Sequence, residues 1–196
     1  MNKLVLELTD QERIVIESAI PLKDLPYIDY VHIIFEEGDK RYMLHIYDIG
    51  EALERFCRVM TENLQGNAVL PFAIRKQDVG YFHNRGKYGP VATRIKKADH
   101  LGSFLVWSSP CIGLYLETWL YNDAQGNIIF HVTELFRRDD IKFIKDQKVA
   151  YKEFMQNYKP TLIRVIPRSI ARTWLAKCKR LLKVVEKNPC TNPCCL

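Results

Sequence analysis

Apolar and polar residues follow two periods along the chain, and these periods predict its strands and helices. Alternation over residues 30–47, around a polar turn at 37–39, predicts a β-hairpin. In a hairpin whose loop has an even number of residues, His32 and His45 share the face opposite the core. The residues expected on the core face are Val31, Ile33, Phe35, Tyr42, Leu44 and Ile46.

A second alternating stretch, residues 114–136, predicts a second hairpin around a turn at 123–127 that is closed by a left-handed glycine. This turn places Trp119 opposite His131 and Glu117 opposite Thr133. The core face is expected to hold Leu116, Leu120, Phe130, Val132 and Phe136. The other face is mixed and aromatic, with Tyr115, Glu117, Trp119, Tyr121, Ile129, His131 and Leu135.

Helical periodicity is clearest after the first hairpin and at the end of the chain. Asp48 as N-cap and Gly66 as a left-handed terminator bound one helix. Its expected stripe is Ile49, Leu53, Phe56, Cys57, Met60 and Leu64. A helix over 142–158 and a long helix over 167–187 are also predicted, with a short strand over 161–166 between them. The stripe of the long helix is Ile170, Trp174, Leu175, Cys178, Leu181, Leu182 and Val185.

Other segments give weaker signals. Leu4, Leu6 and Leu8 alternate with other residues as in a strand, and residues 103–107 predict another. Thr9 and Glu12 have the spacing of a capping box, which predicts a helix to about residue 20, although the β-branched run at 14–16 favours a strand. Residues 66–101 lack a period, and 78–90 are expected to form a long surface loop.

These elements predict an α+β fold: a largely antiparallel sheet built from two hairpins, with three to four helices packed on it. Residues 1–187 are expected to form a single domain, followed by a disordered Cys-rich tail at 188–196. The sequence shows no internal repeat.

Charge is distributed unevenly over the 196 residues. Residues 137–187 contain 15 Lys/Arg and 5 Asp/Glu, whereas residues 1–136 contain 14 Lys/Arg and 18 Asp/Glu. A basic segment of this kind points to an anionic partner rather than to a fold. We therefore expect a non-enzymatic interaction protein that docks an acidic partner protein, as an adaptor, inhibitor or immunity-like protein. Steering cations are expected at Arg168, Arg172, Lys179 and Lys183, and aromatic anchors at Tyr115, Trp119 and Tyr121.

The alternative is RNA binding, with or without metal-independent cleavage. Residues 75–100 hold seven Lys/Arg and two acids, with Arg85 and Lys87 among several aromatic rings. Cations follow a phosphate backbone while rings stack on bases, so this segment and the last helix form the expected RNA surface. His83 is the candidate general base.

Histidine–carboxylate pairs are the remaining candidates for chemistry. Glu117 and His131 are expected as diagonal neighbours that could act as acid and base, and His32 with His45 as two ligands of a zinc site without a third. A structural, hydrogen-bonded role is the ordinary interpretation of each pair. The sequence lacks phosphate-loop, dinucleotide and zinc-hydrolase motifs, so no cofactor is expected.

Cysteine usage and the N-terminus favour a cytoplasmic protein with reduced thiols. Cys57, Cys111 and Cys178 lie among apolar neighbours and are expected in the core. Cys190, Cys194 and Cys195 crowd the tail, where lipid attachment, soft-metal binding, disulfide formation and the absence of any role are all open. Membrane contact through Cys194 and Cys195 is the less favoured interpretation, because no prenylation box is present.

Overall fold

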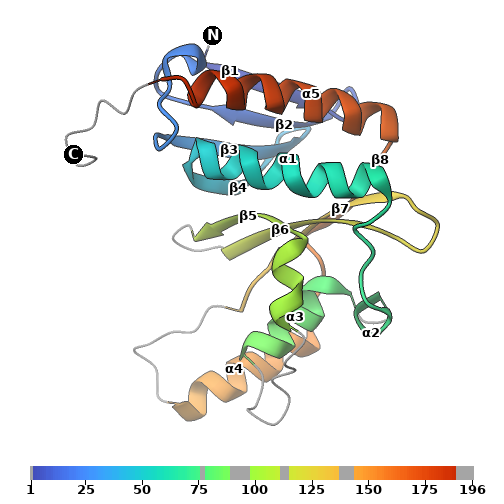
Figure 1. The fold of residues 1–196 in the computed structure, drawn as a ribbon. Coiled ribbons are helices and arrows are strands. Elements are labelled where there is room, and N and C mark those ends of the chain that lie inside the picture. The colour runs from blue at the N-terminus through green and yellow to red at the C-terminus, as the bar shows by residue number, and fades with distance from the viewer. Residues whose placement is uncertain (1, 76–77, 89–97, 111–114, 137–143, 189–196) are drawn as a thin grey trace.

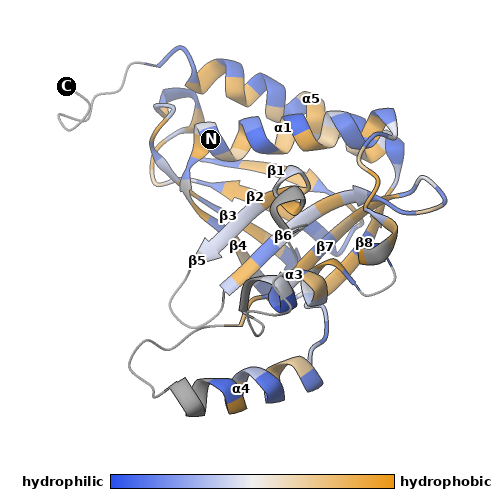
Figure 2. Ribbon diagram, turned by 60° about the horizontal axis from the view of Figure 1, so that its bottom comes forward, coloured by the Kyte–Doolittle hydropathy of each residue, from blue (hydrophilic) through white to orange (hydrophobic). Residues whose placement is uncertain are grey.

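The computed structural model describes residues 2–75, 78–88, 98–110, 115–136 and 144–188 and has the predicted α+β fold (Figure 1). Its strands form two four-stranded antiparallel sheets, in the orders β1-β2-β3-β4 and β5-β6-β7-β8. The helices α1 and α5 lie together on one side of the strands, and α3 and α4 lie on the other side (Figures 1 and 2).

The first sheet is a meander of four strands that follow one another in the chain. Its strands are β1 (Lys3–Glu7), β2 (Glu12–Glu17), β3 (Tyr30–Glu37) and β4 (Lys40–Asp48), with a short 3₁₀ helix η1 (Leu22–Asp24) between β2 and β3. The turn between β3 and β4 uses Gly38 at φ +56°, a conformation that glycine adopts without strain. The predicted first hairpin is therefore present.

The helix predicted from Thr9 is wrong, because this segment is the turn before β2 and the strand itself. The Thr9 hydroxyl accepts hydrogen bonds from the amides of Gln11 and Glu12, as in the predicted cap. The β-branched run that follows pairs with β1 on one side and β3 on the other, so the capped turn closes a hairpin. Ile14 and Ile16 of this run are fully buried in the core.

The first helix, α1 (Ile49–Gln65), matches its prediction. Asp48 occupies the N-cap position, although its side chain makes no capping hydrogen bond, and Gly66 follows the last turn at φ +79°. All of the predicted stripe is buried in the main core except Leu64, which packs partly buried against it. The Phe56 ring stacks on Trp107 of β5 at 5.2 Å between centroids, which fixes α1 over the second sheet.

The second sheet consists of β5 (Leu105–Pro110), β6 (Tyr115–Asn122), β7 (Ile128–Glu134) and β8 (Leu162–Ile166). Trp119 lies opposite His131 and Glu117 opposite Thr133, as predicted for the second hairpin. Gly126 closes the turn at φ +81°. Leu116, Leu120, Phe130 and Val132 are buried in the main core. Phe136 lies beyond β7, and its ring contacts Tyr151 and Phe154 of α4 instead.

The predicted surface loop over residues 78–90 is wrong, because residues 79–88 form a helix. The elements between α1 and β5 are α2 (Phe72–Arg75), α3 (Val79–Tyr88) and the 3₁₀ helix η3 (Ala98–Ser103). α4 (Ile144–Gln156) follows β7 and contacts α3. Val79 and Phe82 of α3 pack with Trp119 in a second, smaller apolar cluster. α3 therefore covers the outer face of the second sheet.

The last helix, α5 (Arg168–Val185), packs against α1. Trp174, Cys178, Leu181 and Val185 of its predicted stripe are buried in the main core, which also contains residues of both sheets. Cys57 and Cys178 are buried reduced thiols, as expected, whereas Cys111 lies outside the described residues. Arg168, at the start of α5, donates a hydrogen bond to the Leu64 carbonyl near the end of α1, so the two helices run antiparallel (Figure 1).

The topology repeats, although the sequence does not. Each sheet is a meander of four strands in chain order, and each meander ends in a long helix, α1 after β4 and α5 after β8. We call each meander with its following helix a unit. The second unit differs from the first by the insertion of α4 between β7 and β8. The two units meet where β4 contacts β5 and where α1 contacts α5.

Candidate functional site

Four cations form a line along α5, which we call the basic flank: Arg168, Arg172, Lys179 and Lys183. At 100° per residue these positions fall within about 60° of the helix circumference, and they extend for about 22 Å along its axis. All four side chains are exposed, while the opposite side of α5 is buried. The four cations expected to steer a partner therefore lie on one accessible side of the last helix.

The basic flank is not neutralised by the acidic first half of the chain. Carboxylates of the first sheet pair with Lys3, Arg13 and Arg41 of the same sheet. Arg164 of β8 pairs with Glu12 and Glu37. Among the described residues, no carboxylate lies within 4.0 Å of Arg172, Lys179 or Lys183. These three charges are available to an anion in solvent.

The basic flank offers charge without an aromatic platform. The only ring of α5, Trp174, is 1% exposed, and its indole nitrogen donates to the Glu7 carbonyl at 2.8 Å. Lys177, on another side of α5, donates to the Val5 carbonyl at 2.9 Å and holds the helix on β1. Base stacking on α5 therefore has no exposed ring to use.

The predicted aromatic anchors lie on the sheet face that α3 covers. Trp119 is 1% exposed and belongs to the second apolar cluster, so it contacts α3 rather than solvent. Tyr115 and Tyr121 are half-buried. The Tyr121 hydroxyl lies 3.2 Å from Nδ1 of His131. In this conformation α3 packs on the sheet face that was expected to bind a partner protein.

Beneath α3, polar side chains converge on Asp78. Its Oδ1 accepts hydrogen bonds from the amides of Gly80 and Tyr81, which caps α3, and from the Tyr158 hydroxyl at 2.8 Å. Its Oδ2 lies 3.5 Å from Nε2 of His131, which has no exposed surface. Asp78 has φ +76°, and among the described residues it alone adopts a positive φ without being glycine. We call Asp78, Tyr121, His131, Thr133 and Tyr158 the Asp78 network.

The candidate acid–base residues pair differently from the prediction. Glu117 and His131 are diagonal neighbours on the hairpin, as expected, but each contacts a residue of the α3 segment. Oε2 of Glu117 lies 3.2 Å from Nε2 of His83, and His131 lies against Asp78. The His83 ring also lies 5.1 Å from Trp119. His83 is thus turned toward the sheet, and its side chain is only 15% exposed.

Burial controls the protonation of the Asp78 network. It lowers the pKa of His131 below 6.5, against the opposing attraction of Asp78. Burial also raises the pKa values of Tyr121 and Tyr158 far above 10. A neutral imidazole between a carboxylate and a phenol could act as a general base, but α3 closes this one from solvent. The arrangement as it stands serves to dock α3.

The first hairpin does not form the proposed pair of zinc ligands. A β-bulge between Ile33 and Ile34 shifts the register, so that His32 lies opposite Ile46 and His45 opposite Ile33. His32 is exposed, while Nδ1 of His45 contacts the Ser108 carbonyl of β5 at 3.2 Å. In the part of the chain that the structure describes, no group of three or more His, Cys, Asp or Glu could hold a metal ion.

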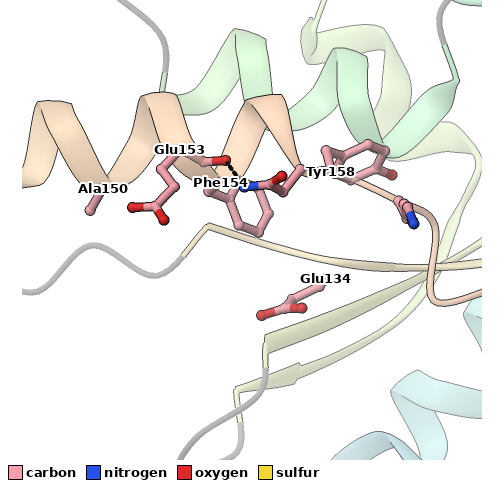
Figure 3. Close-up of a pocket in the computed structure, with 7 residues that line it drawn as sticks. Glu134, Ala150, Glu153, Phe154 and Tyr158 are labelled. Carbon is pink, nitrogen blue, oxygen red and sulfur yellow. Dashed lines mark hydrogen bonds between the residues drawn. The ribbon is translucent and has the colours of Figure 1, made fainter.

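An open groove of about 460 Å³ runs between α4 and the end of β7. Figure 3 shows the carboxylates of Glu134 and Glu153 and the Phe154 ring extending from opposite walls into it. Tyr158 also lines the groove, so the Asp78 network lies just behind it. Lys159 is a further wall residue, which leaves the charge of the groove mixed.

Asp78, Asn84 and Tyr158 are residues of this region that the sequence interpretation missed. The signal for Asp78 was an acidic N-cap before Val79 and Phe82, at helical spacing. Asn84 and Tyr158 had no such signal, because their partners lie about 50 and 80 positions away in the chain. Arg85 is half-buried in α3, and the side chain of Lys87 lies outside the described residues.

Comparisons of the chain with protein-family models, with curated proteins and with solved structures found no match. Within the described residues, no helix has the length and apolar character needed to cross a membrane. Cys190, Cys194 and Cys195 lie outside the described residues.

Proposed function

We propose that the protein is a non-enzymatic interaction protein that docks an acidic partner protein on the basic flank of α5. The observation that carries this proposal is the contrast in ion pairing. Lys3, Arg13 and Arg41 of the first sheet and Arg164 of β8 have carboxylate partners. Arg172, Lys179 and Lys183 have none among the described residues. Unpaired charges aligned on one face steer an oppositely charged protein and accelerate encounter.

The absence of an exposed ring on α5 favours carboxylates over single-stranded RNA as the partner's anions, since RNA binding of this kind uses stacking. Arg168 has a structural role beside any role in binding, because its guanidinium caps the end of α1. Arg172, Lys179 and Lys183 are therefore the residues whose charge can be reversed with least effect on the fold.

The test is affinity capture from the native cells with wild type and two triple variants. Arg172→Glu, Lys179→Glu and Lys183→Glu together reverse the basic flank. Lys148→Glu, Lys152→Glu and Lys159→Glu make the same change in net charge on exposed cations of the α4 region. We expect an acidic protein to be retained by wild type and by the α4 variant, lost by the flank variant, and eluted by salt.

Three outcomes would contradict the proposal. Wild type that retains no stable partner removes the docking role. Equal loss of the partner in both triple variants shows that net charge acts, rather than the basic flank. Retained material that is RNA, and that disappears after nuclease treatment, favours the alternative of RNA binding, for which affinity must fall steeply with salt.

A further inference from the structure

α3 is attached to the second sheet by two kinds of contact. Its apolar contacts belong to a cluster separate from the main core, in which Val79 and Phe82 pack on Trp119. Its polar contacts run from Asp78 and Asn84 to β7 and to Tyr158. A helix held by a small satellite cluster opens at a lower free energy than elements of the main core. Its attachment is therefore sensitive to single polar contacts.

The backbone at Asp78 requires those contacts. A non-glycine residue at φ +76° is strained, and such strain persists only where the surroundings hold it. Asp78 is held by its own capping bonds to α3, by the Tyr158 hydroxyl and by His131. The Tyr158 hydroxyl in turn lies 2.5 Å from Oγ1 of Thr133 on β7. A rearrangement around His131 therefore acts directly on a strained residue.

His131 is the residue of the Asp78 network whose side chain has its ordinary pKa, near 6.5, in the mildly acidic range. A neutral ring with its proton on Nε2 accepts from the Tyr121 hydroxyl at Nδ1, while its Nε2 faces Oδ2 of Asp78 at 3.5 Å without a hydrogen bond. A second proton, on Nδ1, places a buried charge there and removes the acceptor of the Tyr121 hydroxyl. The titratable groups in contact with the ring are Asp78 and Tyr121 of β6, and Tyr158 is linked to the ring through Asp78. His83 of α3 and Glu117 of β6 lie further along the same face.

Both tyrosines stay neutral in this range because burial raises their pKa values, so they do not offset the change at His131. The attraction of Asp78 favours the protonated ring, but the cost of burial is the larger effect and lowers the pKa of His131. A proton taken up from solvent is therefore accommodated better when α3 has left the sheet and the ring is hydrated.

We propose that α3 is an acid-sensitive cover on the aromatic face of the second sheet, released when the buried ring of His131 takes up a proton and can no longer accept the Tyr121 hydroxyl. In the closed state the helix hides Trp119 and the inner side of Tyr121. In the open state the face that carries Tyr115, Trp119 and Tyr121 is exposed to solvent. This cover is independent of the basic flank, which lies on the opposite side of the strands.

The test is amide hydrogen exchange at pH 7.5 and pH 5.5, corrected for the intrinsic dependence of exchange on pH. We expect the protection factors of the α3 amides from Phe82 to Gly86 to fall by up to about tenfold, the limit for one proton linked to opening with an open-state pKa near 6.5. Amides of β2 should stay more protected than those of α3, which shows that opening is local. His131→Gln should abolish the change, and His32→Gln, at an exposed position, should preserve it.

Two results would overturn the proposal that α3 is an acid-sensitive cover. One is an equal fall of α3 protection in wild type and in His131→Gln, or no fall in wild type. The other needs only the wild-type protein, so it holds even if His131→Gln fails to fold. It is an NMR titration of the His131 ring with a midpoint at or above pH 6.5, which would mean that the closed state accepts the proton without cost.

Discussion

Gly80 is the residue on which the contact between α3 and the sheet depends most directly. A Cβ at this position would lie 2.1 Å from Oγ1 of Thr133 and 2.2 Å from the Tyr158 hydroxyl. Both atoms belong to the Asp78 network and have hydrogen-bond partners of their own. A side chain at Gly80 therefore pushes α3 away from β7 or breaks the network.

We expect Gly80→Ala to lower the free energy of unfolding by about 1–3 kcal/mol, despite the better helix propensity of alanine. The measurement is chemical denaturation monitored by circular dichroism. Gly102→Ala is the matched control, because a Cβ at Gly102 meets no atom within 4 Å. Stability of Gly80→Ala equal to that of wild type would mean that α3 does not approach the sheet this closely.

Single residues also explain where sequence interpretation succeeded and failed. Thr9 caps the amide of Glu12 as predicted, but a capped turn can begin a helix or close a hairpin, and only pairing with β1 and β3 decides between them. The pairing of Trp119 with His131 was predictable because the loop length sets the register. The positions of His32 and His45 were not predictable, because the alternation of apolar and polar residues does not reveal a β-bulge.

At the scale of elements, the helices with a continuous apolar stripe were predicted and α3 was not. α1 and α5 bury a stripe over four or more turns, so their sequences alone show the period. α3 has ten residues, and Gly80 and Gly86 interrupt its stripe with the residues typical of loops. Gly80 is required by close packing on β7, a reason that lies in another part of the chain.

Asn84 gives a test of how α3 is docked. Its side-chain amide donates to the Glu134 and Gly80 carbonyls, and its Oδ1 accepts from the Phe136 amide at 2.8 Å. Asn84→Ala leaves buried backbone groups of β7 and the segment after it without these partners. We expect the free energy of unfolding to fall by about 2–4 kcal/mol, since each unsatisfied buried group costs about 1–3 kcal/mol.

The control for this prediction is Asn157→Ala, which removes an exposed amide that donates to the Glu153 carbonyl within one turn of chain. Urea denaturation of both variants should separate them by more than 1 kcal/mol. Equal effects would show that the bonds of Asn84 across α3 and β7 do not stabilise the docked helix.

The whole molecule combines two similar units that differ in charge. Lys3, Arg13 and Arg41 of the first sheet pair with carboxylates of the same sheet, and two further carboxylates reach Arg164 at the edge of the second sheet. The cations of the basic flank lie away from this contact and add to other exposed cations, such as those of the α4 region. The sequence could predict the charge difference between residues 1–136 and 137–187, because charged residues can be counted without a structure. It could not predict the ion pairs of Arg164, whose two partners lie more than 120 positions away in the chain.

The same packing makes the stability of the whole molecule depend on pH in two steps. Burial lowers the pKa values of His131 and His45, the latter despite its bond to the Ser108 carbonyl between the two sheets. Below about pH 6.5, His131 and His45 are protonated in the unfolded chain but stay neutral in the folded protein. Stability is thus fully present above this pH and falls as the pH decreases, by at most about 1.4 kcal/mol per pH unit for each histidine, until the folded pKa values are reached.

The second step belongs to carboxylates such as Glu17. Lys3, and then Arg41, hold the pKa of Glu17 below 4.5, so its contribution is present above pH 4.5 and is lost as the pH falls further. Denaturation midpoints measured from pH 8 to about pH 3 should therefore fall first below about pH 6.5 and again below pH 4.5. His45→Gln should reduce the first fall only, and Glu17→Gln the second only. Midpoints that stay constant between pH 7.5 and pH 5.5 would show that the buried histidines take up protons without cost, and the packing of α3 on β7 and of β4 on β5 would then be looser than described.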